Sequence, residues 1–228
     1  MIRSELFTNA QEVDRNEAFY RQNSKLLKVE LSHGPVQALV GSMVAYQGDA
    51  RFTRKGSGGV KEYFKRNITG QVDNLMFVEG NGEVFFGHGN ADVQVLYLEN
   101  DSVLVNSANL LAFSASLTTE ITRIQTPASY LAGGLWNTRI SGTGYVAILT
   151  AGVPFSLKVE EAPTFADPQA VVLWTPGVRT DIRIDNGGLK SIIRGGTGEA
   201  IQMSFSGQGI VVCQSSEMIT RAEEASQA

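Results

Sequence analysis

Histidine and cysteine are the side chains that most often hold catalytic metals, and this 228-residue chain has few of them. Its two histidines, His33 and His88, each stand beside glycine, which is typical of turns. A zinc or iron site needs at least three converging ligands, commonly two histidines and a carboxylate on adjacent strands. The sequence therefore predicts no metal site and no cofactor.

Nucleophilic catalysis needs a nucleophile with a base beside it, and no such pair is apparent. Cys213 ends an apolar run, where a thiol is more often a small core side chain than a reactive thiolate. The Gly-Ser-Gly-Gly run at 56–59 has the spacing of neither a nucleophile elbow nor a phosphate loop. Asp181 and Asp185 alternate with Arg183 in a strand-like run, which is typical of a solvated strand face. We therefore predict that the protein is not an enzyme.

One segment interleaves basic and aromatic side chains, a combination that can bind single-stranded nucleic acid or a phosphorylated ligand. The basic residues of this candidate ligand-binding site are Arg51, Arg54, Lys55, Lys61, Lys65 and Arg66. The simpler interpretation is a solvated loop and helix whose aromatic rings, from Phe52, Tyr63 and Phe64, pack inward. A net charge of −4 and a pI of about 5.3 disfavour nucleic acid as the partner. Ligand binding at this segment remains an alternative.

The composition is that of a globular protein, with 43% hydrophobic residues. The single cysteine excludes an intrachain disulfide framework and favours a reducing compartment. The first residues contain no apolar run that could act as a secretory signal. No window approaches the roughly 20 apolar residues that cross a bilayer. We expect a cytoplasmic protein without membrane insertion.

The elements that must position these side chains are short apolar runs separated by Gly, Asn, Asp and Ser, which is typical of strands and turns. The expected strands are 26–31, 36–40, 75–79, 84–86, 93–98, 103–106, 110–114, 145–150, 155–159, 171–174, 178–184, 200–206 and 209–213. We expect tight hairpin turns at 79–82, 98–101 and 206–209, where glycine and asparagine supply a positive φ. The stretches 60–67 and 189–194 could each hold a short helix.

A glycine pattern recurs three times: a Gly-Gly pair, then a Thr-Gly pair, then a further glycine. The copies are Gly58-Gly59 with Thr69-Gly70 and Gly80, Gly133-Gly134 with Thr143-Gly144 and Gly152, and Gly187-Gly188 with Thr197-Gly198 and Gly207. A short motif precedes each copy, at 40–44, 107–111 and 175–178, and serves as a landmark for the repeat. In the second of these motifs, Ala108 stands where the other two have glycine. Such regularity predicts a triplicated β module.

This repeat divides the chain into three parts. We expect an N-terminal polar segment over 1–25, a single triplicated β domain over 26–216, and a flexible tail over 217–228. Within the domain, the expected repeats cover about 26–100, 101–168 and 169–216.

At these landmarks the sequence resembles the family named for altered inheritance of mitochondria, also described as like the tryptophan RNA-binding attenuation protein (TRAP-like). The matching residues are Gly41-Ser42-Met43-Val44, Gly58-Gly59, Asp73-Asn74-Leu75 leading to Glu83-Val84-Phe85-Phe86, and Gly187-Gly188-Leu189-Lys190-Ser191-Ile192-Ile193. The resemblance covers roughly Leu26 to Ser215. It implies a short double-stranded β-helix, triplicated with pseudo-threefold symmetry in one subunit and assembled into rings, with a largely undefined biochemical activity. The chain lacks an Arg-rich presequence, so it looks like a bacterial-type member.

The expected fold is therefore all-β, with three fused antiparallel modules. The expected function is that of a non-catalytic, self-assembling structural or interaction protein, forming a ring-like homo-oligomer with a trimer favoured. The segment before Leu26, carrying Phe7, Phe19 and Tyr20, is the expected clasp on a neighbouring subunit. The alternatives are binding of nucleic acid or an anionic ligand through Arg51–Arg66, and a cupin-like metalloenzyme.

Overall fold

The chain folds almost entirely into antiparallel β-strands in the computed structural model, which describes residues 2–54, 68–69, 74–123, 136–184 and 201–216. Nearest the N-terminus lie β1 (Phe19–Asn23), β2 (Leu26–Glu30), β3 (Val36–Leu39), β4 (Met43–Arg54), β5 (Ile68–Thr69) and β6 (Leu75–Phe86). The middle strands are β7 (Asp92–Asn106), β8 (Leu110–Ser114), β9 (Thr118–Arg123) and β10 (Trp136–Thr150). The last are β11 (Phe155–Lys158), β12 (Thr164–Ala166), β13 (Val171–Trp174), β14 (Val178–Ile184), β15 (Ile201–Gly207) and β16 (Ile210–Cys213). The helical elements are the short helix α1 (Leu6–Asn9) and the 3-10 turns η1 (Leu31–His33) and η2 (Ser107–Asn109). The all-β prediction is confirmed.

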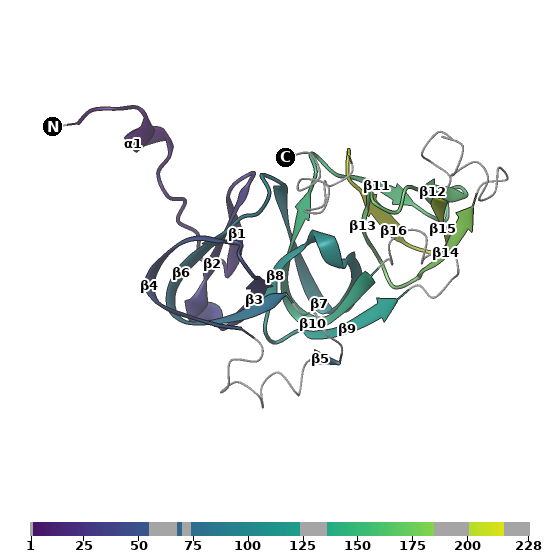
Figure 1. Ribbon diagram of the computed structural model, residues 1–228, viewed down its shortest axis with the longest axis horizontal. Helices are drawn as coiled ribbons and strands as arrows, with labels where there is room; N and C mark the ends of the chain where they lie inside the picture. The colour runs from purple at the N-terminus through teal and green to yellow at the C-terminus, as the bar shows by residue number, and fades with distance from the viewer. Residues whose placement is uncertain (1, 55–67, 70–73, 124–135, 185–200, 217–228) are drawn as a thin grey trace, which may run out of the picture.

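The strands lie side by side roughly in chain order along the longest axis of the molecule (Figure 1). The main path of the large sheet runs β1-β2-β6-β3-β8-β10-β7-β13-β16-β11, while β4 pairs with β6 and β9 pairs with β10. A second sheet contains β12, β15 and β14. Apart from the short parallel contact of β5 with β9, every described strand pair is antiparallel.

Long antiparallel ribbons, each bent where glycines lie, occur at three places. In the ribbon of β4 and β6, Gly48 lies opposite Gly82. In the ribbon of β7 and β10, the register shifts next to Gly142. The third ribbon joins β13 and β14 to β15 and β16, and Gly207 lies at its bend. At Gly80 a Cβ would lie 2.0 Å from a carbonyl oxygen of β4 at a φ of +134°, so only glycine permits this close approach.

The structure has bends in paired strands at the places where hairpin turns were expected. Residues 79–82 lie inside the continuous strand β6, and residues 98–101 lie inside β7. Residues 206–209 join β15 to β16, and these two strands pair with other strands instead of with each other. The physical reason is that a positive-φ residue, glycine at two of these places and Asn100 in β7, can bend a paired strand as readily as it can reverse a free one.

The apolar runs predicted most strands close to their observed bounds, but several strands were missed. The missed strands are β1, β4, β5, β9, β12 and the first half of β10. β4 is largely exposed and contains Gly48 and Asp49, so it lacks the apolar run on which the prediction depended. The expected helices at 60–67 and 189–194 and all three Gly-Gly pairs lie outside the described residues, and the triplication of one module stays a prediction.

Three apolar clusters fill the interior. The first contains Phe19 and Phe86, and the second contains Phe113. The third contains Trp174 and Phe205, whose rings pack edge to face with centroids 6.2 Å apart. Such burial of large apolar side chains supplies most of the stabilisation of a β protein.

Two features of the structure disagree with the expected division of the chain. The N-terminal segment 1–25 contains β1, and its Phe19 and Tyr20 are each only 2% exposed. Because both rings are buried in their own chain, they cannot clasp a neighbouring subunit, and that part of the expectation is wrong. The expected boundary between the first and second repeats, at residues 100/101, falls inside β7. The expected tail at 217–228 lies outside the described residues.

Candidate functional site

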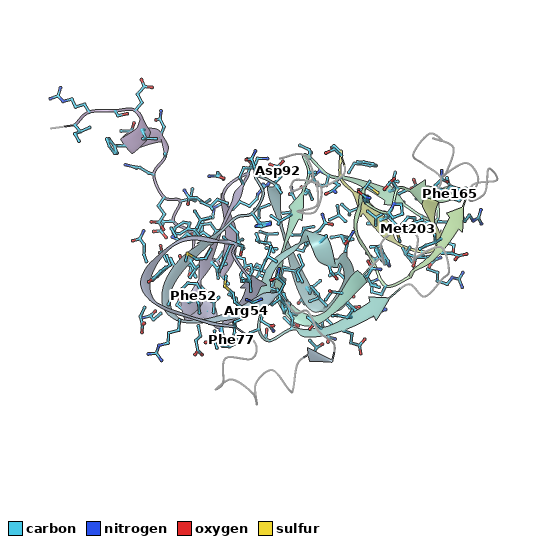
Figure 2. All side chains as sticks on the ribbon, viewed as in Figure 1. Phe52, Arg54, Phe77, Asp92, Phe165 and Met203 are labelled. Atoms are coloured by element: carbon cyan, nitrogen blue, oxygen red, sulfur yellow. The ribbon has the colours of Figure 1, made fainter. Side chains whose placement is uncertain are left out.

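The basic segment can be placed only in part. Arg51 and Arg54 are exposed on β4, and Arg54 lies near Phe52 on that strand (Figure 2). An odd spacing along a strand sends the two arginines to opposite faces. Arg51 lies 4.0 Å from the carboxylate of Asp49, and both side chains are more than 70% exposed. Lys55, Lys61, Lys65 and Arg66 lie outside the described residues.

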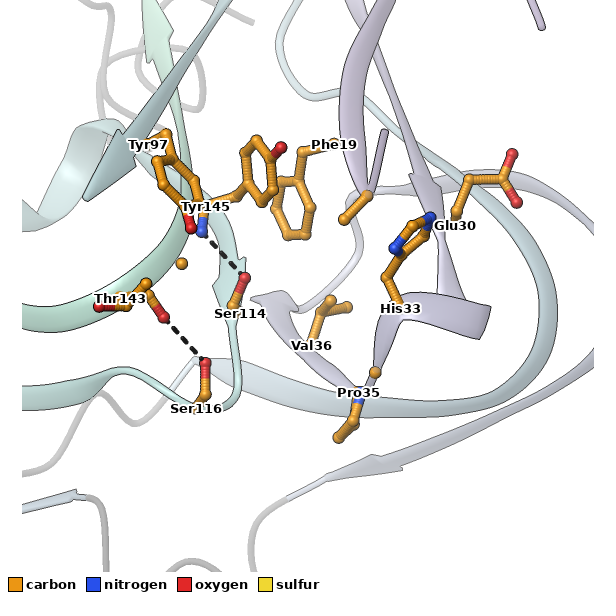
Figure 3. A pocket seen from close by; sticks show the side chains of 13 residues that line it. Phe19, Glu30, His33, Pro35, Val36, Tyr97, Ser114, Ser116, Thr143 and Tyr145 are labelled. Carbon is orange, nitrogen blue, oxygen red and sulfur yellow. Dashed lines mark hydrogen bonds between the residues drawn. The ribbon is translucent and has the colours of Figure 1, made fainter. Parts of the chain in front are cut away.

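The structure contains a pocket that the sequence analysis did not predict, with a volume of about 310 Å³. It lies where β1, η1 and β3 meet β7, β8 and β10 (Figure 3). Its lining residues are Ala18, Phe19, Glu30, His33, Gly34, Pro35, Val36, Tyr97, Ser114, Ser116, Thr143, Gly144 and Tyr145. We call it the aromatic pocket.

Three rings form one wall of the aromatic pocket. Tyr97 and Tyr145 are register partners on β7 and β10, and their ring centroids are 4.8 Å apart. Tyr145 also stacks on Phe19 of β1, with centroids 5.5 Å apart and an interplanar angle of 7°. Tyr97 is 55% exposed, so its ring remains open to a ligand. The wall offers the flat apolar surface on which another ring can stack.

Hydroxyl groups lie beside the aromatic wall of the pocket and hold its backbone in place. Ser114 Oγ accepts a 3.0 Å hydrogen bond from the backbone N–H of Tyr145. Ser116 Oγ donates a 3.3 Å hydrogen bond to the carbonyl of Thr143. Both contacts join β8 and its following turn to β10 (Figure 3). These hydroxyls therefore fix the positions of the strands that line the aromatic pocket.

A buried lysine on β2, Lys28, forms a second feature that was not among the expected candidates. Lys28 is 1% exposed and contacts the carboxylates of Glu12, Glu30 and Glu83, at 3.2 Å from Glu30 and 2.9 Å from Glu83. Its register partners, Tyr20 on β1 and Phe85 on β6, place their rings 5.5 and 5.7 Å from the ammonium group. A buried ammonium needs such partners, because an unpaired charge is very costly away from water. We call Lys28 and its three glutamates the Lys28 cluster.

The protonation of the Lys28 cluster follows from its contacts. Burial lowers the pKa of Lys28, but hydrogen bonds to Glu12, Tyr20 and Glu83 outweigh it and hold the pKa above its ordinary value. A hydrogen bond with Glu12 raises the pKa of Glu83, although the ammonium opposes this change. The hydrogen bond with Glu83, followed by that with Lys28, lowers the pKa of Glu12. The two carboxyl groups share a site, so Glu83 is the one that holds a proton more readily.

The remaining candidates occupy structural positions. Cys213 is buried, and burial raises the pKa of its thiol to about 11, which leaves it neutral and unreactive near pH 7. Asp181 and Arg183 are exposed on β14, as a solvated strand face requires, while Asp185 lies outside the described residues. His33 lines the aromatic pocket. In the described part of the chain, no group of three or more His, Cys, Asp or Glu side chains is placed to hold a metal ion.

The aromatic pocket and the Lys28 cluster both escaped the sequence analysis. The one local signal for the cluster was a lysine inside the apolar run Leu26–Val29. The pocket had no local signal, because Phe19, Tyr97 and Tyr145 come together only through strand pairing.

The fold and these features define a class of all-β proteins built from bent antiparallel ribbons with a surface pocket between strands. Within that class, the chain belongs to the family described as Mitochondrial biogenesis AIM24, whose model matches residues 17–216. This match confirms the resemblance found in the sequence.

A solved structure shares the fold. The crystal structure of protein SPYM3_0169 from Streptococcus pyogenes has a TM-score of 0.69 and 22% sequence identity, with 94% of each chain covered. At this identity the likeness shows the fold alone. No curated protein matches the chain. No helix among the described residues is long and apolar enough to span a membrane.

Proposed function

We propose that this chain is a non-catalytic structural or interaction protein that assembles with copies of itself into a closed ring, most simply a trimer. The observation that carries the proposal is the exposure of apolar side chains at both ends of the row of strands. Surfaces of this kind commonly mark contacts between proteins.

One end is the outer edge of β11, which terminates the main path of the large sheet. Val153 and Phe155 are 78% and 51% exposed there, and Ile210 on the adjoining β16 is 40% exposed. Among the described residues, β11 pairs only with β16, so its other edge offers unpaired backbone groups. Such an edge favours pairing with a further chain.

At the other end of the molecule lies β4, which is off the main path of the sheet and pairs only with β6 among the described strands (Figure 1). Met43, Val44 and Tyr46 on this strand are 40%, 61% and 49% exposed. Two different apolar surfaces at the two ends are what a head-to-tail contact requires, and such contacts close into a ring when the rotation per subunit permits.

Further features support the proposal. The recurrence of a glycine-bent ribbon at three places agrees with three fused modules derived from one repeat. The buried, neutral Cys213 and the structural role of the pocket hydroxyls favour a binding role over a catalytic one. We place the protein in the cytoplasm, in agreement with its single reduced cysteine.

Light scattering coupled to size exclusion tests the proposed assembly. We expect one species near three times 24.6 kDa at micromolar concentration. Replacing Phe155 with Asp, or Tyr46 with Asp, places a charge in one of the two contact surfaces and should shift the protein toward the monomer. Phe165→Asp is the matched control, because Phe165 is 44% exposed on the separate small sheet. A monomeric wild-type protein would overturn the proposal, while another closed oligomer would change only the number of subunits.

A further inference from the structure

The N-terminal arm, residues 2–10, projects from the body of the protein as a short helical turn on an extended stem (Figure 1). Ile2, Leu6 and Phe7 are 84%, 65% and 57% exposed on it. The hydrogen bonds described for this arm join arm residues only to one another. Three large apolar side chains therefore face water on a segment that the rest of its own chain does not cover.

The root of the arm is fixed, in contrast to the arm itself. The Val13 N–H donates a 2.9 Å hydrogen bond to the side chain of Gln22, whose amide donates to the carbonyl of Gln11 at 3.1 Å. Glu12 between them reaches the buried Lys28. The arm is thus aimed outward from a firm base, and its nine residues can span up to about 30 Å when extended. That reach is sufficient to contact a second molecule.

The aromatic pocket has the size and chemistry to accept an aromatic side chain. Its volume of about 310 Å³ accommodates one phenylalanine ring, and Tyr145 and the exposed Tyr97 provide a stacking surface. Glu30 lies at its rim and belongs to the Lys28 cluster, where three carboxylates surround one ammonium. The excess of negative charge beside the pocket complements a basic residue on the occupant.

We propose that the arm of one copy of this chain docks on a second copy, with Phe7 in the aromatic pocket and Arg3 facing Glu30. The inference rests on the proposed self-assembly and names the contact that reinforces it. The arm supplies both required groups, since Arg3 lies four positions before Phe7. A buried aromatic anchor of this kind typically dominates the energy of an interface.

Cysteine cross-linking in the full chain tests the contact directly. Ser116 is exposed at the pocket and differs from cysteine by a single atom, and Thr8 is exposed next to Phe7 on the arm. Thr8→Cys/Ser116→Cys keeps the Phe7 anchor and should form covalent multimers on mild oxidation. Neither single variant should do so, and native Cys213 is buried and does not interfere. The control is Thr8→Cys/Ser206→Cys, because Ser206 is also exposed but lies on β15 of the separate small sheet, outside both proposed contact surfaces. An excess of a peptide spanning residues 2–10 should suppress the cross-link, and the same peptide with Phe7→Ser should be weaker by about tenfold or more.

The outcomes separate this inference from the proposed assembly. Equal cross-linking in the control, or a product that migrates as a cross-linked monomer, would refute docking on a second copy. If the multimers are missing but light scattering still finds the closed oligomer, the arm contact is wrong and the assembly stands. If the wild-type chain is monomeric but a labelled 2–10 peptide binds it and requires Phe7, the pocket contact is correct and the ring is wrong.

Discussion

The side-chain amide of Asn109 donates a 3.1 Å hydrogen bond to the side-chain carbonyl of Gln214, 105 positions further along the chain. Both side chains are buried, at 1% and 3% exposure. Gln214 also accepts a hydrogen bond from the Ala151 N–H and donates one to the carbonyl of Gln169. One glutamine thus joins η2, the end of β10 and the segment before β13.

Replacing Gln214 with Leu should lower the free energy of unfolding by about 1–3 kcal/mol, because it leaves the buried Asn109 amide and the Ala151 N–H without this acceptor. Chemical denaturation followed by fluorescence measures the change. Gln208→Leu is the control, since that glutamine is exposed. Equal costs at the two positions would show that the buried network adds nothing.

Lys28→Met should be among the most destabilising single substitutions in the chain. It removes the ammonium from three glutamates, and breaking a buried ion pair in this way costs about 3–5 kcal/mol. Lys25→Met is the matched control, because Lys25 is 42% exposed and its 3.0 Å pair with Asp92 is a surface contact. Exposed pairs contribute at most about 1 kcal/mol. Urea denaturation of both variants checks the difference, and a Lys28 variant as stable as the Lys25 variant would contradict the role of the cluster.

Glu83 gives the Lys28 cluster a pH dependence. Its folded-state pKa is raised above the ordinary value of 4.5, so the folded chain binds this proton more tightly than the unfolded chain. Binding of this proton therefore stabilises the folded chain when the pH is below the ordinary pKa. That contribution is lost as the pH rises through the raised pKa. Glu12, with its lowered pKa, has the opposite effect at more acidic pH. We expect Glu83→Gln to flatten the decrease in stability that begins as the pH rises above the ordinary pKa of 4.5. An unchanged slope would exclude Glu83 as its source.

Cys213 should make the protein less stable at alkaline pH. Its thiol has an ordinary pKa of 9.0 and a folded-state pKa of about 11, so the unfolded chain loses this proton first. Stability then falls as the pH rises above 9.0, by about 1.4 kcal/mol at pH 10. Cys213→Val removes this loss, whereas the raised pKa of Lys28 acts only above 10.5. Denaturation under reducing conditions should show the flatter profile in the variant, and parallel profiles would refute the assignment.

Gly80→Ala tests the bend in the β4 and β6 ribbon. The new methyl group would lie 2.0 Å from the carbonyl oxygen of Asp49, so we expect a loss of about 3 kcal/mol or more. Gly41→Ala isolates the backbone strain, because Gly41 has a φ of +82° but a methyl group added there would meet no atom within 4 Å. Its expected cost is about 1–2 kcal/mol. Thermal unfolding of both variants gives the comparison, and similar melting temperatures would show that the close approach is not required.

The sequence predicted the fold class well, because apolar runs such as the one over β13 must be buried wherever they occur. It also found glycines at the ribbon bends, namely Gly80, Gly144 and Gly207. The sequence could not distinguish a bent strand from a hairpin turn, because glycine has a positive φ in both. The difference lies in which strands pair with each other. β4 was missed for a related reason: its stability depends on pairing with β6 and not on its own hydrophobicity.

The candidate site was less predictable than the fold. The basic segment was visible because its residues are close in sequence, yet only Arg51 and Arg54 can be placed. The aromatic pocket depends on the register that sets Tyr97 opposite Tyr145, and a single sequence does not specify register over such distances. The three glutamates around Lys28 come from the N-terminal segment, β2 and β6, and only the folded chain brings them together.

The strand β10 has a mechanical consequence for the whole chain. It pairs with β7 along nearly its full length, and its opposite edge pairs with β9 in the first half and β8 in the second. The backbone N–H groups of β10 alternate between these two edges, and each set is released only when a strand inside the sheet separates from β10. We expect these amides to exchange with deuterated solvent only when the entire molecule unfolds. We also expect a force that pulls the two ends of the large sheet apart to meet its highest resistance at β10, in the middle of the row of strands.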